Sequence, residues 1–152
     1  MGTAAGECRG VWDGDHVLAE RVPIRLDDIP FAVALTDEQG AVHTWRRTLV
    51  DPDSGHTVFH VHFGPGQRGE PHWHPSDTLY VFQEGSLEVE GEATYYAGDV
   101  RFVRGGFAYG AEVGGPEGCT FIFVSLGPYG RFDPDTDAPP RGRWDAATQT
   151  TL

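Results

Sequence analysis

The chain has 152 residues, the size of one domain, and 39% of them are hydrophobic, enough for one core. Its net charge is −12 and all eleven basic residues are arginine, which argues against binding nucleic acid or an anionic membrane, because phosphates favour a basic patch. No apolar run has the length of a membrane span or a secretory leader, and Cys8 and Cys119 are the only cysteines. We therefore predict a cytoplasmic, soluble protein with free thiols.

The distribution of glycine and proline indicates an all-β fold. The chain contains 21 glycines and 11 prolines between many short apolar runs, a pattern typical of a sandwich or barrel. We predict a loose arm over residues 1–16, a β-barrel domain over 17–127, and a tail rich in proline and aspartate over 128–152.

The first predicted strands precede the most informative part of the chain. FAVAL, at 31–35, follows Pro30 and favours a strand. VHTWRRTLV, at 42–50, alternates without revealing which face is buried, and DPDSG, at 51–55, predicts a turn.

The segment TVFHVHF, at 57–63, alternates strictly between apolar and histidine side chains. Two orientations are open. If the histidines face inward, His60 and His62 could join another histidine pair in a four-histidine site. We favour the reverse, with Phe59, Val61 and Phe63 inward, because burying a large apolar side chain contributes about 1.5–3 kcal/mol.

A second histidine pair stands at the centre of the stretch GQRGEPHWHPSDTLYVFQEG, residues 66–85. Alternate residues of a strand point to the same side, so His72 and His74 would place two imidazoles on one face, within reach of one metal ion. Pro71 and Pro75 flank the pair. An isolated H-x-H is weak support for a metal site, and its sequence context is therefore decisive.

The remaining strands are predicted from short apolar runs. Leu79 to Phe82 fit a strand packed on both faces that turns at Gly85. LEVEGEATYY, at 87–96, indicates a hairpin, and VRFVR, at 100–104, and CTFIFVSL, at 119–126, predict two further strands.

The histidine stretch resembles the first motif of the cupin superfamily, which runs G, five residues, HxH, three or four residues, Glu, six residues, Gly. Gly66, His72, His74 and Gly85 match this pattern, whereas Thr78 stands at the glutamate position.

The second cupin motif, G-x5-P-x-G-x2-H-x3-N, is similar to GDVRFVRGGFAYGAEV. Gly98 and Gly106 match, but Arg104 replaces the proline, Tyr109 the third histidine and Val113 the asparagine. The resemblance extends over residues 57 to 126. It implies a single-domain, cupin-like (jelly-roll) antiparallel β-barrel whose interior holds a small ligand.

The resemblance also implies chemistry. Cupins commonly bind iron, manganese, nickel, copper or zinc through three histidines and a glutamate, and act as dioxygenases, decarboxylases, isomerases, lyases or cyclases. Others are metal-free epimerases or sensors. Thr78 and Tyr109 are poor replacements for the missing ligands, because a threonine hydroxyl is a weak donor and a phenol binds metal well only as phenolate. Asp77 could supply a carboxylate only if a bulge turned it inward.

Two hypotheses follow. In the favoured one, His72 and His74 hold one divalent transition metal (Fe, Mn, Ni, Cu or Zn) with Tyr109, Asp77 or water, and the enzyme activates dioxygen or a carbonyl or enol of a small organic substrate. In the alternative, no metal is held tightly. His72, His74, Thr78 and Tyr109 then form a polar pocket that binds a ligand or performs acid-base chemistry. The catalytic candidates are Tyr109 and Thr78, and the substrate-pocket candidates are Tyr80 and Phe82.

A third interpretation gives the histidine pair no functional role and treats both as hydrogen-bonded core residues of a structural or interaction domain. We also predict a homodimer, because Leu79, Val81 and the strand from Phe31 to Leu35 could cover an apolar outer face.

Overall fold

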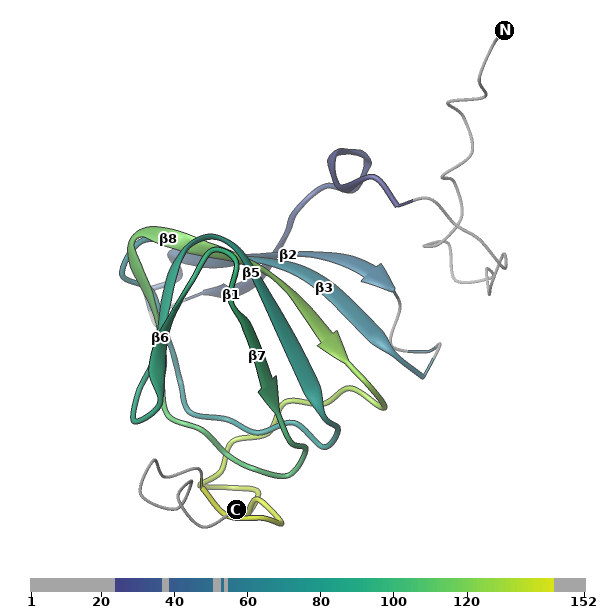
Figure 1. Ribbon diagram of the computed structural model, residues 1–152, viewed down its shortest axis with the longest axis vertical. Coiled ribbons are helices and arrows are strands. Elements are labelled where there is room, and N and C mark those ends of the chain that lie inside the picture. Colours follow the sequence, from purple (N-terminus) through teal and green to yellow (C-terminus); the bar gives the residue numbers. More distant parts are fainter. Residues whose placement is uncertain (1–23, 37–38, 51–52, 54, 144–152) are drawn as a thin grey trace, which may run out of the picture.

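The computed structural model describes residues 24–36, 39–50, 53 and 55–143 (Figure 1). The predicted arm, residues 1–16, lies outside these ranges. Among the described residues, no helix has the length and hydropathy needed to cross a membrane.

The described chain is almost entirely β-strand, which confirms the predicted all-β antiparallel barrel. One 3-10 turn, η1 (Leu26–Asp28), precedes the sheet. The strands are β1 (Ala32–Thr36), β2 (Val42–Val50), β3 (Thr57–Phe63), β4 (Arg68–Gly69), β5 (Thr78–Val89), β6 (Ala93–Tyr96), β7 (Val100–Val103) and β8 (Glu112–Ser125). Each strand predicted from the sequence is present, and β8 begins well before the predicted residue 119.

All pairings between these strands are antiparallel, and together they form one curved sheet in the order β1-β2-β3-β8-β5-β6, with β4 beside β8 and β7 beside β5. Strands β5 and β8 are the long central pair. Their register shifts twice, between Phe82 and Glu84 and between Gly85 and Leu87. Both strands therefore bend, and the sheet curves round (Figure 1).

Two glycines make this bend possible. Gly85 has φ +67° and Gly118 has φ +78°, a region that side chains disfavour. A Cβ on Gly85 would come within 2.0 Å of the Gly118 carbonyl oxygen. The prediction that the strand turns at Gly85 is therefore wrong in one respect: β5 continues through Gly85 to Val89, because it stays paired with β8 on both sides of this position.

Strand β3 has the orientation favoured from the sequence. Phe59, Val61 and Phe63 are at most 8% exposed and face the interior. His60 and His62 lie on the outer face, where their rings contact Phe31 and Trp45 respectively.

The chain after β8 packs against the barrel. Residues 128–143, the described part of the predicted tail, run along the histidine loop. Trp73 and Phe132 form a β-bridge and stack with ring centroids 4.6 Å apart, and Trp73 Nε1 donates to the Asp137 carbonyl at 2.8 Å. This segment therefore closes one end of the barrel and supplies residues to its interior.

Candidate functional site

His72 and His74 lie side by side at the end of the barrel covered by residues 128–143. The two rings are nearly perpendicular, with centroids 5.0 Å apart, and both side chains are buried. His72 forms a β-bridge with Tyr109. The structure thus brings together three of the residues predicted for the site.

The tautomer of His72 is fixed by the main chain. His72 Nδ1 lies 2.8 Å from the Glu70 carbonyl oxygen, which can only accept, so Nδ1 carries the proton. Nε2 must then accept the hydrogen bond from the Tyr109 hydroxyl at 2.9 Å. The Tyr80 hydroxyl in turn donates to Tyr109 at 2.6 Å. The sequence Tyr80, Tyr109, His72, Glu70 is therefore a directed hydrogen-bond chain.

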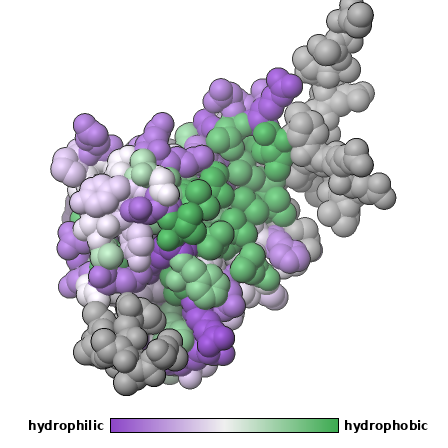
Figure 2. Space-filling view, viewed as in Figure 1, coloured by the Kyte–Doolittle hydropathy of each residue, from purple (hydrophilic) through white to green (hydrophobic). Residues whose placement is uncertain are grey.

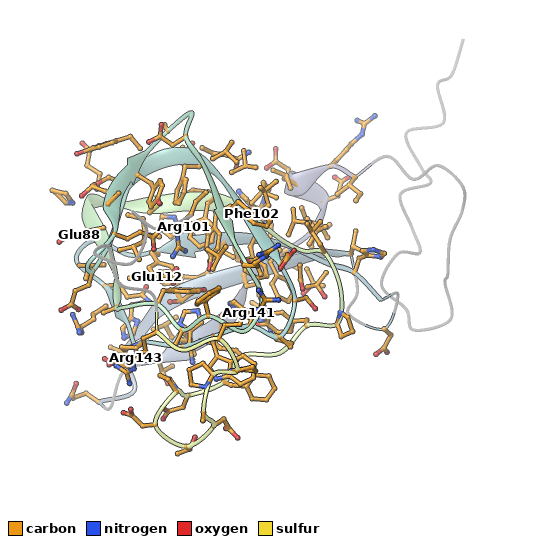
Figure 3. The ribbon with its side chains drawn as sticks, turned by 60° about the horizontal axis from the view of Figure 1, so that its bottom comes forward. Glu88, Arg101, Phe102, Glu112, Arg141 and Arg143 are labelled. Carbon is orange, nitrogen blue, oxygen red and sulfur yellow. The ribbon has the colours of Figure 1, made fainter. Side chains whose placement is uncertain are left out.

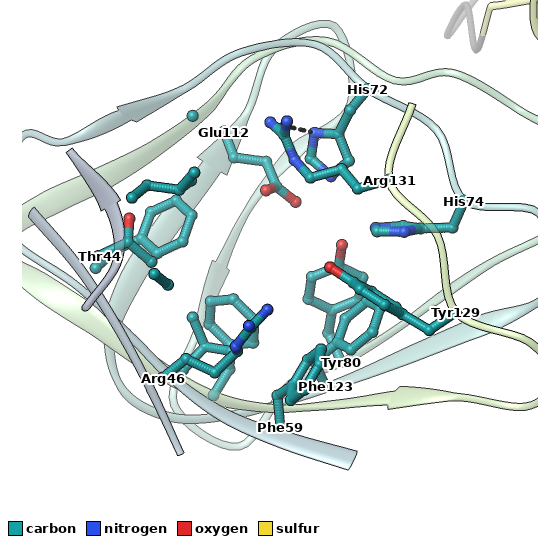
Figure 4. A pocket seen from close by; sticks show the side chains of 16 residues that line it. Thr44, Arg46, Phe59, His72, His74, Tyr80, Glu112, Phe123, Tyr129 and Arg131 are labelled. Atoms are coloured by element: carbon teal, nitrogen blue, oxygen red, sulfur yellow. Dashed lines mark hydrogen bonds between the residues drawn. The ribbon is translucent and has the colours of Figure 1, made fainter. Parts of the chain in front are cut away.

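His74 is oriented in the same manner but keeps one nitrogen for other partners. Its Nδ1 donates to the Gly130 carbonyl oxygen at 2.5 Å. Nε2 therefore carries a lone pair, and the ring projects towards the cavity from the side opposite Thr44 (Figure 4).

Burial keeps both histidines neutral. It lowers the pKa of His72 to about 3, and the nearby Arg131 guanidinium acts in the same direction. The pKa of His74 also falls to about 3, because of burial and the neighbouring His72. At neutral pH both imidazoles are uncharged acceptors.

Glu112 is the carboxylate of this site. It is 3% exposed and lies inside the barrel beside Arg101 (Figure 3), whose Nη1 is 3.4 Å from Glu112 Oε1. Burial raises the pKa of Glu112, whereas Arg101 opposes that rise. Arg101 is itself held by Glu92 through two hydrogen bonds of 2.7 Å.

The cavity has a volume of about 120 Å³ and is lined on one side by aromatic and aliphatic groups and on the other by polar ones (Figure 4). The lining residues are Ala34, Leu35, Thr44, Arg46, Phe59, Val61, Phe63, Gly69, His72, His74, Tyr80, Glu112, Phe121, Phe123, Tyr129 and Arg131.

Two predicted site residues lie elsewhere. Thr78 is 1% exposed, does not line the cavity, and its hydroxyl has no hydrogen-bond partner within the described chain. Phe82 packs in the core, where it stacks on Tyr95 with centroids 5.1 Å apart. Tyr80, by contrast, lines the cavity.

The residues present do not fit the metal that the resemblance implies. Within the described ranges, no three His, Cys, Asp or Glu side chains are grouped to hold an ion, and divalent ions normally require at least three good ligands. The lone pair of His72 Nε2 is occupied by Tyr109. Burial also raises the Tyr109 pKa far above its usual value, which disfavours the phenolate that would bind metal. Of the two histidines at this site, His74 is the one whose Nε2 has no hydrogen-bond partner among the described residues.

Several residues of the site were not predicted from the sequence: Glu112, Arg46, Tyr129 and Arg131. Glu112 carries a weak signal, since it follows Tyr109 by three residues within the altered second motif. Arg46 lies in a strand whose inner face the pattern left open. Tyr129 and Arg131 belong to a segment without periodicity, so no local pattern indicated their position.

Solved structures of other proteins share this fold. An RmlC-like cupin protein from Ralstonia eutropha JMP134 superposes with a TM-score of 0.59 at 16% identity, covering 76% of this chain and 73% of that one. The polyketide cyclase RemF from Streptomyces resistomycificus superposes with a TM-score of 0.60 at 21% identity, covering 74% of this chain and 82% of that one. An acetylacetone dioxygenase from Acinetobacter johnsonii superposes with a TM-score of 0.59 at 24% identity, covering 80% of this chain and 83% of that one.

At these identities the likeness shows the fold, and the predicted cupin resemblance is confirmed at that level. No family model matches the sequence. No curated protein matches it either.

Proposed function

We propose that this protein, which has the cupin fold, is an enzyme that moves a proton on a small carbonyl or enol substrate without a metal, as an isomerase, lyase or cyclase does. The observation that carries the proposal is that the Glu112 carboxylate and the neutral His74 imidazole line the same cavity. Glu112 can remove a proton from the carbon beside a carbonyl and return it, and the guanidinium groups of Arg46 and Arg131 in the same lining can stabilise the enolate oxygen in between.

Glu112 is the stronger candidate for the base. A buried carboxylate with a raised pKa accepts a proton more readily than an ordinary one. Arg101 contacts it from behind, and because Glu92 holds Arg101 through both ends of its carboxylate, the position of Glu112 is fixed. Arg101 and Glu92 therefore act as positioning residues.

His74 supports the reaction as a hydrogen-bond acceptor. Because its pKa is about 3, it stays neutral and offers Nε2 to an enol or hydroxyl of the substrate. The directed chain from Tyr80 to His72 holds the neighbouring wall in place, since every donor in that chain has an acceptor.

The proposal is tested by hydrogen exchange in D₂O. Protein treated with a chelator is incubated with phenylpyruvate or phenylacetone, which differ in their carboxylate, and replacement of C–H by C–D beside the carbonyl is followed by NMR. We expect exchange above the buffer rate, and a loss of about a hundredfold in Glu112→Gln. Glu88→Gln, which changes an exposed glutamate on β5 (Figure 3), serves as the matched control.

Wild-type exchange in Glu112→Gln, or exchange that appears only after a transition metal is added, would contradict the proposal. The second result would return the metal-dependent hypothesis to first place, and elemental analysis of the purified protein would then identify the ion.

The outer face of the sheet supports the predicted homodimer. Apolar side chains from β7, β5 and β8 lie next to one another by register, and Figure 2 shows a continuous hydrophobic area on this side of the molecule. Val100 and Phe102 are 57% and 56% exposed. A second copy suits this face, because other surfaces of a chain with net charge −12 would bring like charges together.

Light scattering tests this assembly. We expect a dimer at about 50 µM, a concentration on the order of typical weak association constants, and a monomer in Phe102→Asp, since the new charge would be buried. A wild-type monomer at that concentration would rule the dimer out.

A further inference from the structure

Two arginines of the cavity lack an acidic partner within the described part of the chain. Arg47, Arg68, Arg101 and Arg143 each form an ion pair there, but Arg46 and Arg131 form none with a described residue.

Arg46 points inward from β2. It pairs in register with Val61, whose side chain faces the cavity, and its guanidinium lies 4.2 Å from the centroid of the Phe59 ring. A ring face attracts the cation without accepting its N–H groups as a carboxylate would. Arg46 therefore keeps donors for a planar acceptor, and Figure 4 shows its guanidinium directed into the cavity.

Arg131 reaches the same cavity from residues 128–143. One of its nitrogens, Nη2, lies 3.3 Å from the Glu70 carbonyl oxygen, which anchors the side chain beside His72. The same nitrogen also lies 3.4 Å from His72 Nδ1 (Figure 4). Because both contacts involve Nη2 alone, most of the five guanidinium donors stay available. Arg131 is exposed, so it stands at the mouth of the cavity, whereas Arg46 is half-buried.

The cavity is consequently positive although the chain is acidic. His72 and His74 are neutral, and Arg101 carries one positive charge against the two carboxylates of Glu92 and Glu112, which leaves one negative charge that the two remaining arginines outweigh. Arg46 and Arg131 remain as two positive charges without acidic partners among the described residues. Such a site favours an anion over a neutral molecule of the same shape.

We propose that the ligand of this cavity is a small carboxylate with an apolar body about the size of one ring. Guanidinium groups match a carboxylate through paired, parallel hydrogen bonds. Phe59, Phe121 and Phe123 supply the apolar wall. The volume of about 120 Å³ is comparable with that of a cavity of about 150 Å³ that accommodates benzene in another protein.

This inference rests on the proposed function for its biological meaning, but binding requires no catalysis and is measured separately. Benzoate and benzamide are the probes, because they share one ring and differ in charge. Isothermal titration calorimetry of the full chain at pH 7 gives their affinities. We expect benzoate to bind at least about tenfold more tightly than benzamide.

Arg46→Gln and Arg131→Gln should each weaken benzoate by about tenfold and change benzamide by less than about twofold. Arg143→Gln removes the same charge from a surface pair with Asp135 and should leave both affinities unchanged. Circular dichroism establishes that each variant is folded.

Three results would overturn the inference: equal affinity for the two probes, unchanged benzoate affinity in both cavity variants, or no binding of benzoate at about 10 mM. Benzoate binding without any proton exchange would remove the proposed function and leave the ligand class standing. Proton exchange on phenylacetone as fast as on phenylpyruvate would remove the carboxylate as the ligand class and leave the proposed function standing.

Discussion

The two H-x-H pairs have the same local sequence spacing but different surroundings. His60 and His62 contact side chains on the outer face, Gln83 and Thr120. His72 and His74 donate to main-chain carbonyls of Glu70 and Gly130 and face the cavity side of the barrel. Spacing sets whether two histidines share a face, but the neighbouring residues decide which face that is.

The largest expected difference between the pairs concerns acid stability. An unfolded histidine binds a proton near pH 6.5, whereas folded His72 and His74 do so only near pH 3. Below pH 6.5 the unfolded state therefore binds more protons, and stability decreases as pH falls. By pH 5 the loss is about 2 kcal/mol for each residue, or about 4 kcal/mol for the pair.

Urea unfolding at pH 7 and pH 5 measures this loss. His74→Asn should remove about half of it, whereas His62→Asn should leave it intact. A pH dependence that disappears in the outer-face variant instead would reverse the assignment.

Next in size is the effect of each pair on catalysis. His74→Ala removes an acceptor from the cavity and should slow proton exchange by about ten- to a hundredfold, which corresponds to about 1.4–2.7 kcal/mol in the barrier. His60→Ala and His62→Ala should change the rate by less than about twofold, because their strand turns Phe59 and Val61 inward. NMR exchange rates decide between the pairs, and a larger loss in the outer-face variants would disprove the comparison.

The smallest predicted effect concerns the inner pair alone. Tyr109→Phe leaves His72 Nε2 without a donor and Tyr80 without an acceptor, so we expect a loss of about 1–2 kcal/mol in stability and about tenfold in exchange rate. Zinc affinity should not fall, because the substitution frees a nitrogen lone pair. A clear fall in calorimetric zinc titrations would instead identify Tyr109 as a metal ligand.

The sequence predicted those parts of the molecule whose structure is determined by residues close together in the chain. Strict alternation in residues 57–63 located β3 and its inner face. The short motif around His72 and His74 predicted the fold and the position of the histidine pair. Such signals depend on neighbours within a few residues.

The remaining features depend on long-range contacts. Arg101 faces inward between exposed Val100 and Phe102, which no hydrophobic pattern would predict. It does so because it forms ion pairs with Glu92 and Glu112 inside the barrel. The start of β8 contains Pro116 and several glycines, which are typical of a loop, yet it pairs with β4 and β5. No local pattern reveals a partner that lies far away in the chain.

The carbonyl of Gly130, which sets the tautomer of His74, has a consequence for how the protein is made. Residues 128–143 leave the ribosome after every barrel strand, so a nascent chain could fold its sheet before the site exists. Until Gly130 and Arg131 arrive, His74 has no fixed tautomer and the cavity lacks its outer cation. A chain that ends before these residues would therefore have the barrel without a complete site.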